Sequence, residues 1–178
     1  MSIAYLLSGS NLGDRAGNLQ SAITYIGKLA GEIVECSSVF ESSSWGFDHP
    51  TPFLNQTLKV KTSLEPHELL KTLLKIEDKC GRVRRNIEEY ESRTLDIDIL
   101  FYDDLVIEDP DLTIPHPLLH LRRFTLLPLS TIAAGLVHPI LHKSVKELLD
   151  ACPDDSLVTE ASNCSCSCCE KKEADDAV

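Results

Sequence analysis

The stretch TLDIDILFY, residues 94–102, decides the fold of this chain because it supplies the last strand of a recognisable order of elements. Successive side chains of a strand point to opposite faces of the sheet, and the residues of this stretch alternate in that way. Leu95, Ile97, Ile99 and Phe101 are expected on one side, and Thr94, Asp96, Asp98 and Leu100 on the other.

Hydrophobic periodicity predicts a regular series of elements before this strand. They are a strand at 3–8, a helix at 19–30, a strand at 33–41, a strand at 54–62 and a helix at 66–80. Gly31 and Gly81 follow the two helices, where glycine commonly ends a helix. In the strand at 54–62, Asn55, Lys59 and Lys61 alternate with the buried positions, and the two lysines are expected to face water.

Together these elements make the order β-α-β-β-α-β, which is typical of the ferredoxin-like arrangement in the α+β class, an antiparallel sheet with helices on one face. After residue 102 the pattern predicts a hairpin and short helices around 125–134 and 144–150. We therefore expect one domain over residues 1–152. From residue 153 onward the periodicity stops, and residues 153–178 are expected to form a disordered, acidic, cysteine-rich tail.

The composition excludes several classes of protein. The 178 residues include 28 acidic and 17 basic side chains, a net charge of −11, whereas nucleic-acid and anionic-membrane binders need clustered positive charge. No apolar run approaches the roughly 18 residues of a membrane span, and the first residues lack the features of a secretory signal. Seven cysteines, four of them crowded between residues 164 and 169, fit a secreted disulfide framework poorly. We expect a cytoplasmic monomer without nucleic-acid or membrane partners.

Asp96 and Asp98 are the first candidates for chemistry. Alternate residues of a strand project from the same face with Cα atoms about 6.6 Å apart, so the two carboxylates are expected to lie side by side. Such a pair suits Mg²⁺, which takes one or two carboxylates together with phosphate oxygens and water. The alternative is a pair of aspartates on a solvated face of the sheet, neutralised by lysines.

Arginines indicate a phosphate ligand near this pair. Six of the seven arginines lie between residues 82 and 123, and guanidinium groups bind phosphate in a bidentate way. Arginines beside metal-binding carboxylates favour phosphoryl transfer, although ion pairing with Glu88, Glu89 and Glu91 would also use them. His116, held between two prolines, is a candidate donor to phosphate or a histidine with a structural role.

Aromatic side chains suggest a planar ligand. Trp45, Phe53 and Phe124 lie in or beside predicted loops, and Asn55 offers both a donor and an acceptor to the edge of a heterocycle. Each of these aromatic residues, taken alone, is better explained as part of the core. Their combination with the acidic pair and the arginines is what favours a binding site.

These features together resemble those of a known family. The matching segments are GSNLGDR at 9–15, FLN at 53–55, GRVR at 81–84, SRTLDIDILFYDD at 92–104, TIPHPLL at 113–119 and RRF at 122–124. In this order and at this spacing, from about residue 3 to 149, they resemble the 6-hydroxymethyl-7,8-dihydropterin pyrophosphokinases of folate biosynthesis. The resemblance implies a ferredoxin-like fold and transfer of diphosphate from ATP, with two Mg²⁺ ions, to the hydroxymethyl group of a reduced pterin, releasing AMP.

The resemblance also assigns roles to individual residues. It implies that Asp96 and Asp98 hold both metal ions, and that Arg82 and Arg93 act on the phosphates in catalysis. The residues implied to bind the pterin are Ser42, Ser43, Trp45, Gly46, Phe53, Asn55, Asp96 and Phe124, with the two phenylalanines on either side of the ring. The residues implied to bind ATP are Glu77, Arg84, Tyr90, Ile99, Thr113, His116 and Arg122, with Ile99 against the adenine.

The chain departs from the family pattern in the loop before residue 94. Glu89 and Tyr90 stand where members carry an Arg-Trp pair, and we hypothesise that Arg85 compensates for the lost cation. Asp111 stands where some members have an arginine near the nucleotide, and the segment 42–45 lacks the common Thr-Pro pair.

Two other classes share part of the pattern. Nucleotidyltransferases also combine a Gly-Ser turn with an Asp-x-Asp pair, but there the two lie close together in sequence, whereas here Gly9 and Asp96 are far apart. Copper-carrier domains share the ferredoxin-like order but hold a Cys-x-x-Cys pair after the first strand, where this chain has GSNLG. Release of AMP rather than pyrophosphate from ATP distinguishes the first class from the expected kinase.

Overall fold

The computed structural model describes residues 1–45, 50–81 and 94–161. Its elements follow the predicted order. They are β1 (Ser2–Ser10), α1 (Arg15–Leu29), β2 (Glu32–Cys36), β3 (Phe40–Ser42), β4 (Phe53–Thr62), α2 (Pro66–Lys79), β5 (Asp96–Tyr102), β6 (Ile107–Glu108), β7 (Thr113–Ile114), a short 3-10 helix (Leu119–Leu121), α3 (Arg123–Ala133), α4 (Val145–Asp150) and β8 (Val158–Glu160).

The main sheet is antiparallel and has the strand order β5-β1-β4-β3-β8, with β2 also paired to β4. This order confirms the ferredoxin-like α+β prediction, and β6 with β7 forms the predicted hairpin. The single strand predicted at 33–41 is divided into β2 and β3. Ser37 lies at the division, where its backbone N–H donates to the Thr57 carbonyl and its Oγ accepts from the Thr57 N–H, both at 2.9 Å. A serine side chain that bonds backbone in this way competes with the regular ladder.

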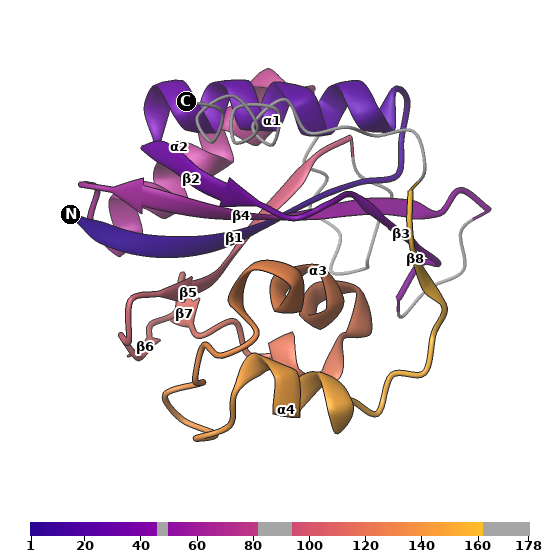
Figure 1. The fold of residues 1–178 in the computed structure, drawn as a ribbon. Helices are drawn as coiled ribbons and strands as arrows, with labels where there is room; N and C mark the ends of the chain where they lie inside the picture. Colours follow the sequence, from indigo (N-terminus) through magenta and orange to yellow (C-terminus); the bar gives the residue numbers. More distant parts are fainter. Residues whose placement is uncertain (46–49, 82–93, 162–178) are drawn as a thin grey trace, which may run out of the picture.

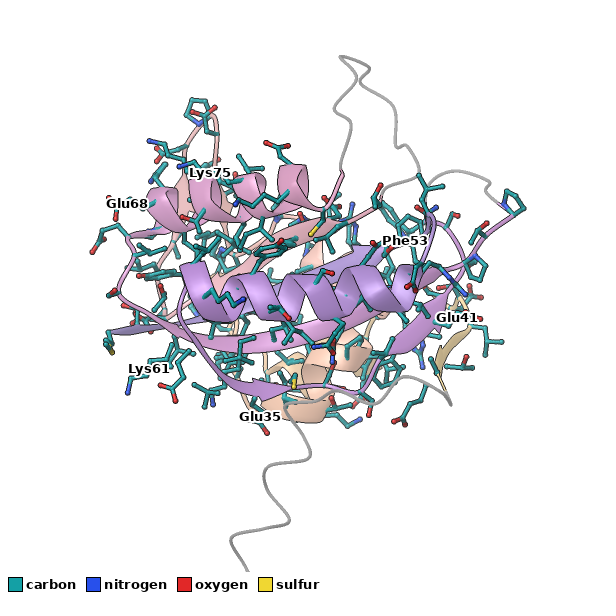
Figure 2. All side chains as sticks on the ribbon, turned by 90° about the horizontal axis from the view of Figure 1, so that it is seen from above. Glu35, Glu41, Phe53, Lys61, Glu68 and Lys75 are labelled. Atoms are coloured by element: carbon teal, nitrogen blue, oxygen red, sulfur yellow. The ribbon has the colours of Figure 1, made fainter. Side chains whose placement is uncertain are left out.

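Helices cover both faces of the sheet. Figure 1 shows α1 and α2 on one face and α3 with α4 on the other, so the expectation of helices on a single face is incomplete. In α2, Leu69 and Leu73 are buried against the sheet, whereas Glu68 and Lys75 project outward (Figure 2). This amphipathic spacing explains why α2 packs as the periodicity predicts.

Two separate apolar cores result from this layering. The first lies under α1 and α2 and includes Leu6, Leu58 and Leu73, all fully buried. The second lies beside α3 and α4 and includes Phe101 and Leu126. The C-terminal helices, whose positions the sequence periodicity predicted to within two residues, therefore build a second core on the face that an ordinary ferredoxin-like sheet leaves open.

A β-bulge in β5 changes which face its last residues occupy. In the pairing with β1, Tyr5 lies opposite Phe101 and Leu6 opposite Ile99, so Leu100 is the extra residue. Ile99 packs in the first core, whereas Leu100 and Phe101 both pack in the second. The alternation predicted for 94–102 is therefore wrong at Phe101, because the bulge places two consecutive residues on one face.

The segment after α4 is ordered further than predicted. Residues 153–161 do not belong to a disordered tail, because β8 adds to the sheet beside β3 and the Ala161 N–H donates to the Val39 carbonyl at 2.8 Å. The Asp154 carboxylate accepts hydrogen bonds from the N–H groups of Arg123 and Ser156. Residues 162–178, with the clustered cysteines, lie outside the described residues. Among the residues described, no helix is long and apolar enough to cross a membrane.

Candidate active site

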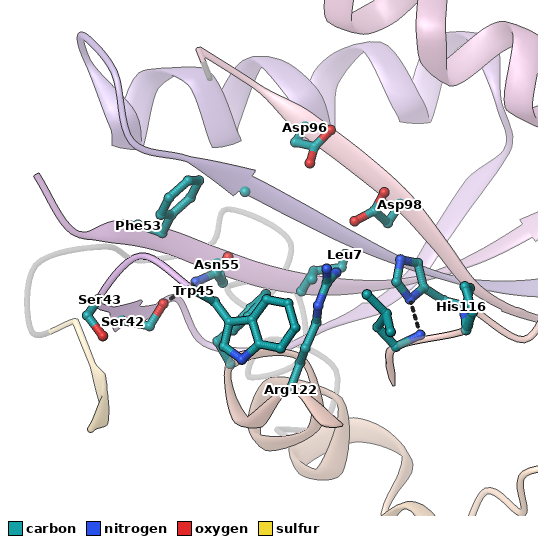
Figure 3. Close-up of a pocket in the computed structure, with 14 residues that line it drawn as sticks. Leu7, Ser42, Ser43, Trp45, Phe53, Asn55, Asp96, Asp98, His116 and Arg122 are labelled. Carbon is teal, nitrogen blue, oxygen red and sulfur yellow. Dashed lines mark hydrogen bonds between the residues drawn. The ribbon is translucent and has the colours of Figure 1, made fainter. Parts of the chain in front are cut away.

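A cavity of about 240 Å³ opens on the face of the sheet that carries α3. Figure 3 shows side chains entering it from the sheet and from the segments beside the sheet. Strands β1, β4 and β5 contribute Leu7, Gly9, Phe53, Asn55, Asp96 and Asp98. The remaining lining residues are Ser42, Ser43, Trp45, His116, Pro117, Leu118, Arg122 and Phe124. The cavity therefore gathers segments that are far apart in the sequence.

Asp96 and Asp98 both line this cavity, as the alternation in β5 predicts. They lie opposite Gly9 and Leu7 of β1, which line the cavity from the neighbouring strand. The intervening Ile97 packs into the core on the other face. Both carboxylates are half-buried, so they are reachable from the cavity while the backbone that carries them is fixed in the sheet.

The aromatic candidates surround the same space. The guanidinium carbon of Arg122 lies 4.6 Å from the centre of the Trp45 ring and 5.7 Å from that of Phe124. At these distances the cation is attracted to the ring faces. Phe53 enters from β4 (Figure 3). Arg122 is 7% exposed, so its side chain is held within the cavity lining rather than extended into water.

Asn55 contributes a fixed amide to the cavity. It is 2% exposed, although the alternation in 54–62 placed it with the water-facing lysines, because α3 packs over that face of β4. Its Nδ2 donates to Ser42 Oγ at 2.9 Å, which orients the amide and directs its oxygen toward Gly9. A Cβ atom at Gly9 would lie 3.1 Å from Asn55 Oδ1, so glycine leaves room for this oxygen beside the cavity.

The described geometry makes His116 a neutral hydrogen-bond donor. Its backbone N–H donates to the Leu100 carbonyl at 3.0 Å, and its Nδ1 accepts from the Leu118 N–H at 3.2 Å. Burial, followed by the positive charge of Arg122, lowers the pKa of His116 from its ordinary 6.5 to about 4, against the opposing effect of Asp96. Because Nδ1 accepts a hydrogen bond, the proton of the neutral ring sits on Nε2.

Three of the residues that the resemblance assigns to ATP do not line the cavity. Glu77 is 1% exposed on α2, and its Oε1 accepts from the Ile97 N–H at 2.8 Å, between the two aspartates of β5. Ile99 packs in the first core, and Thr113 is exposed on the β6–β7 hairpin. Glu77 thus lies against the strand that carries the carboxylates, on the face opposite the cavity.

The remaining sequence candidates lie outside the described residues. They are Gly46, Arg82, Arg84, Tyr90 and Arg93, together with Arg85 and Glu89 of the compensation hypothesis. Sequence reasoning did not select Leu7, Gly9, Pro117 and Leu118 as cavity residues. The first two could have been found from strand register, because they pair with Asp98 and Asp96, and the other two directly follow His116.

In the cavity, the carboxylate pair of Asp96 and Asp98 is what the described residues offer a metal. Within 1–45, 50–81 and 94–161, no group of three or more His, Cys, Asp or Glu side chains could hold a metal ion. Two carboxylates on one rigid strand leave most of the coordination shell to other oxygen ligands. This donor set fits Mg²⁺, which commonly completes its shell with substrate phosphates and water.

Comparisons with known proteins identify the family of the chain. Residues 5–134 match the family described as 7,8-dihydro-6-hydroxymethylpterin-pyrophosphokinase (HPPK). The 2-amino-4-hydroxy-6-hydroxymethyldihydropteridine pyrophosphokinase of Aquifex aeolicus is 44% identical over 147 residues, which cover 83% of this chain and 90% of that protein. The protein of the same name from Synechocystis is 42% identical over 143 residues, covering 80% of this chain and 72% of its own.

Solved structures show the same fold. The crystal structure of Plasmodium falciparum HPPK-DHPS with STZ-DHP superposes with a TM-score of 0.68 over 84% of this chain at 18% identity. The A437G form with SDX-DHP gives a TM-score of 0.70 at the same identity and coverage. This chain spans 43% and 45% of those longer chains.

Proposed function

Because the chain belongs to the 7,8-dihydro-6-hydroxymethylpterin-pyrophosphokinase family, we infer that it transfers diphosphate from ATP to the hydroxymethyl group of 6-hydroxymethyl-7,8-dihydropterin in folate biosynthesis, releasing AMP. One observation supports this most directly. A pair of carboxylates, a buried arginine and several aromatic rings line one cavity, which combines the needs of a metal-bound phosphate chain with those of a flat heterocycle.

The pterin is proposed to occupy the space between Phe53 and Phe124. Ring faces above and below suit a flat molecule, and the fixed Asn55 amide offers its oxygen to a polar edge. Ser42 supports this role because its Oγ already holds the Asn55 Nδ2. Ser43, Trp45, Gly46 and Asp96 complete the proposed pterin site.

The phosphates of ATP are proposed to lie between Asp96, His116 and Arg122. A neutral imidazole with its proton on Nε2 donates one hydrogen bond without adding charge, while Arg122 supplies the fixed cation. Arg82 and Arg93 are proposed to act on the same phosphates during transfer. Glu77, Arg84, Tyr90, Ile99 and Thr113 complete the proposed ATP set, and the contribution of Glu77 is to hold β5 through Ile97.

Asp96 and Asp98 would hold Mg²⁺, and the proposal includes two ions. When bound, the metal neutralises phosphate charge and acidifies a coordinated hydroxyl group. The chain itself fixes the two carboxylates in the sheet and orients the pterin edge through Asn55. It also keeps a cation beside the phosphates, so that the reacting groups are positioned before reaction.

Oligomeric state and location are part of the same proposal. We propose a monomer in the cytoplasm whose partners are the two small substrates, without nucleic acid or membrane. A single peak at about the mass of one chain in size-exclusion chromatography with light scattering would support the monomer, and a dimer mass would contradict it.

The decisive test is product identity. The purified protein is incubated with ATP, Mg²⁺ and 6-hydroxymethyl-7,8-dihydropterin, and the nucleotides are separated by chromatography. AMP formed in equal amount to the pterin diphosphate supports the proposal. ADP or free pyrophosphate as the main product would contradict it, since these indicate a monophosphate kinase or a nucleotidyltransferase. Asp98→Asn should abolish AMP release, whereas Asp104→Asn, an exposed aspartate just beyond the same strand, should not.

A further inference from the structure

The cavity has two sides that are held by different parts of the chain. On one side, Ser42 at the end of β3 lines the cavity and holds Asn55. On the other side, Arg122 and Phe124 line it at the start of α3. The segment 153–161, here named the C-terminal strap, contacts both sides without lining the cavity itself.

The strap first contacts the start of α3. Asp154 Oδ2 accepts from the Arg123 N–H at 2.9 Å, and its Oδ1 accepts from the Ser156 N–H at 3.0 Å. Arg123 lies between the two cavity residues Arg122 and Phe124. The first N–H groups of a helix have no partner within the helix, and a negative charge is favourable there, so this contact fixes the backbone from which both side chains project.

Asp154 is charged at neutral pH. Partial burial raises the pKa of its carboxyl group, but hydrogen bonds from Ser156 and from the Arg123 backbone outweigh this, and the pKa lies below its usual value. The neighbouring Asp155 is exposed, whereas Asp154 accepts the hydrogen bond from the Arg123 N–H.

The strap then contacts the other side of the cavity. In β8, Val158 pairs with Ser42, Thr159 with Glu41 and Glu160 with Phe40. Figure 1 shows β8 alongside β3 at the edge of the sheet. Because β3 is only three residues long, its pairing with β8 on one side and β4 on the other determines where Ser42 stands.

Only a short stretch of chain joins the two contacts. From Asp154 to Val158 the backbone advances four residues and can span at most about 14 Å. The Ser42 side and the Arg122–Phe124 side of the cavity are therefore linked by a connection that cannot lengthen freely. Loss of either contact would remove this link and leave the spacing of the two sides to the packing of α3 on β3 and β4.

We propose that Asp154 is a positioning residue for the pterin site, acting through the C-terminal strap to set the spacing between Ser42 and the Arg122–Phe124 pair. This rests on the proposed function only for the identity of the ligand. The geometric part, that Asp154 fixes the backbone of Arg122 and hence its packing on Trp45, is independent of any substrate.

The test compares Asp154→Ala, Asp154→Asn and Asp155→Ala. In Asp154→Ala the KM for the hydroxymethyl pterin should rise about fivefold, the size expected from loss of a helix cap, with kcat changed less than twofold. The KM for ATP should rise as well, because Arg122 also lies at the proposed phosphate site. Asp154→Asn keeps one carbonyl acceptor and should show a smaller rise. Asp155→Ala removes the same charge from the exposed neighbour and should match the wild type.

A second readout needs no substrate. Trp45 is the single tryptophan of the chain, so its emission reports the packing of Arg122 on the indole ring. The ligand-free emission spectrum should change in Asp154→Ala and not in Asp155→Ala. A failure of the proposed function would show as absent AMP release in the wild type, with this spectral difference intact.

The proposal is overturned if Asp154→Ala matches Asp155→Ala in both the pterin KM and the Trp45 spectrum. Should Asp154→Ala not fold, the same comparison is made with Asp154→Asn, and its identity with Asp155→Ala in both measurements overturns the proposal. A change in melting temperature alone, without either readout, would show that the strap only stabilises the domain and would also overturn it.

Discussion

The two faces of the sheet carry different kinds of residue. The face under α1 and α2 carries the larger apolar core, with Glu77 as a buried acid in its packing. The other face is divided, with the cavity and its carboxylates at one end and the second core, around Phe101, at the other. A continuous core on one face can hold the sheet together. The opposite face is then able to keep the two carboxylates of Asp96 and Asp98 side by side.

The largest effect should come from the divided face. Asp96→Ala or Asp98→Ala should lower kcat by about a thousandfold, since each removes a proposed metal ligand, while the free energy of unfolding changes by less than about 1 kcal/mol. Steady-state assays and urea unfolding measure the two quantities. Asp104→Ala serves as the control, and retention of a tenth of the activity in either cavity variant would contradict the comparison.

The apolar face should respond in the opposite way. Leu73→Ala, at a fully buried position under α2, should lower the free energy of unfolding by about 2–5 kcal/mol because it leaves a cavity in the core. Below the unfolding transition, kcat should stay within about twofold of the wild type. Leu105→Ala, at an exposed leucine, should change stability by less than about 0.5 kcal/mol. A large loss of kcat in folded Leu73→Ala would show that the faces are not separable.

Phe124→Ala tests the role of one aromatic ring within the cavity itself. Loss of a stacking ring should raise the KM for the pterin about tenfold and change kcat by less than about threefold. Phe124→Tyr keeps the ring and should stay close to the wild type. If kcat falls while the KM is unchanged, Phe124 does not stack on the pterin.

His116 should make stability depend on pH. Its folded-state pKa of about 4 lies below the ordinary 6.5, so between these values the unfolded chain binds a proton that the folded chain does not. Stability should therefore fall as the pH drops from 6.5 toward 4. His116→Gln has no such titration, and its unfolding free energy should fall less over this range. Parallel pH curves for the two proteins would contradict the buried neutral histidine.

The smallest effect should come from the segment that follows the C-terminal strap. Truncation after Ala161 removes residues 162–178 and keeps the C-terminal strap intact. Kinetic constants should stay within about twofold, and the melting temperature should change by only a few degrees. A marked loss of turnover would assign the cysteine-rich segment a role in the reaction.

Much of the fold follows from local patterns. The apolar spacing of Leu69, Leu73 and Ile76 predicts α2, and the alternation around Asp96 and Asp98 correctly places both carboxylates on one face. The bulge was not predictable, because Leu100 and Phe101 are both apolar and fit either face. The burial of Asn55 was missed for another reason, since periodicity does not show which strand a later helix will cover.

The site was harder to predict from sequence patterns than the fold. Alternation alone could not bring Trp45, Phe53 and Phe124 to one cavity, because their contacts depend on how loops fold across the sheet; the family resemblance named them together. The strap was missed because VTE at 158–160 is a very short strand with mostly exposed side chains, whose pairing depends on the available edge of β3.

The bulge in β5 also constrains how this domain can vary in length. Leu100 is the extra residue of the strand, and its carbonyl accepts the backbone N–H of His116 at 3.0 Å. The extra residue therefore connects β5, which carries the two aspartates, to the loop that carries His116. Deleting it would restore a regular ladder yet detach that loop. A designer who transplants this strand into another sheet must carry the irregularity along with the two aspartates.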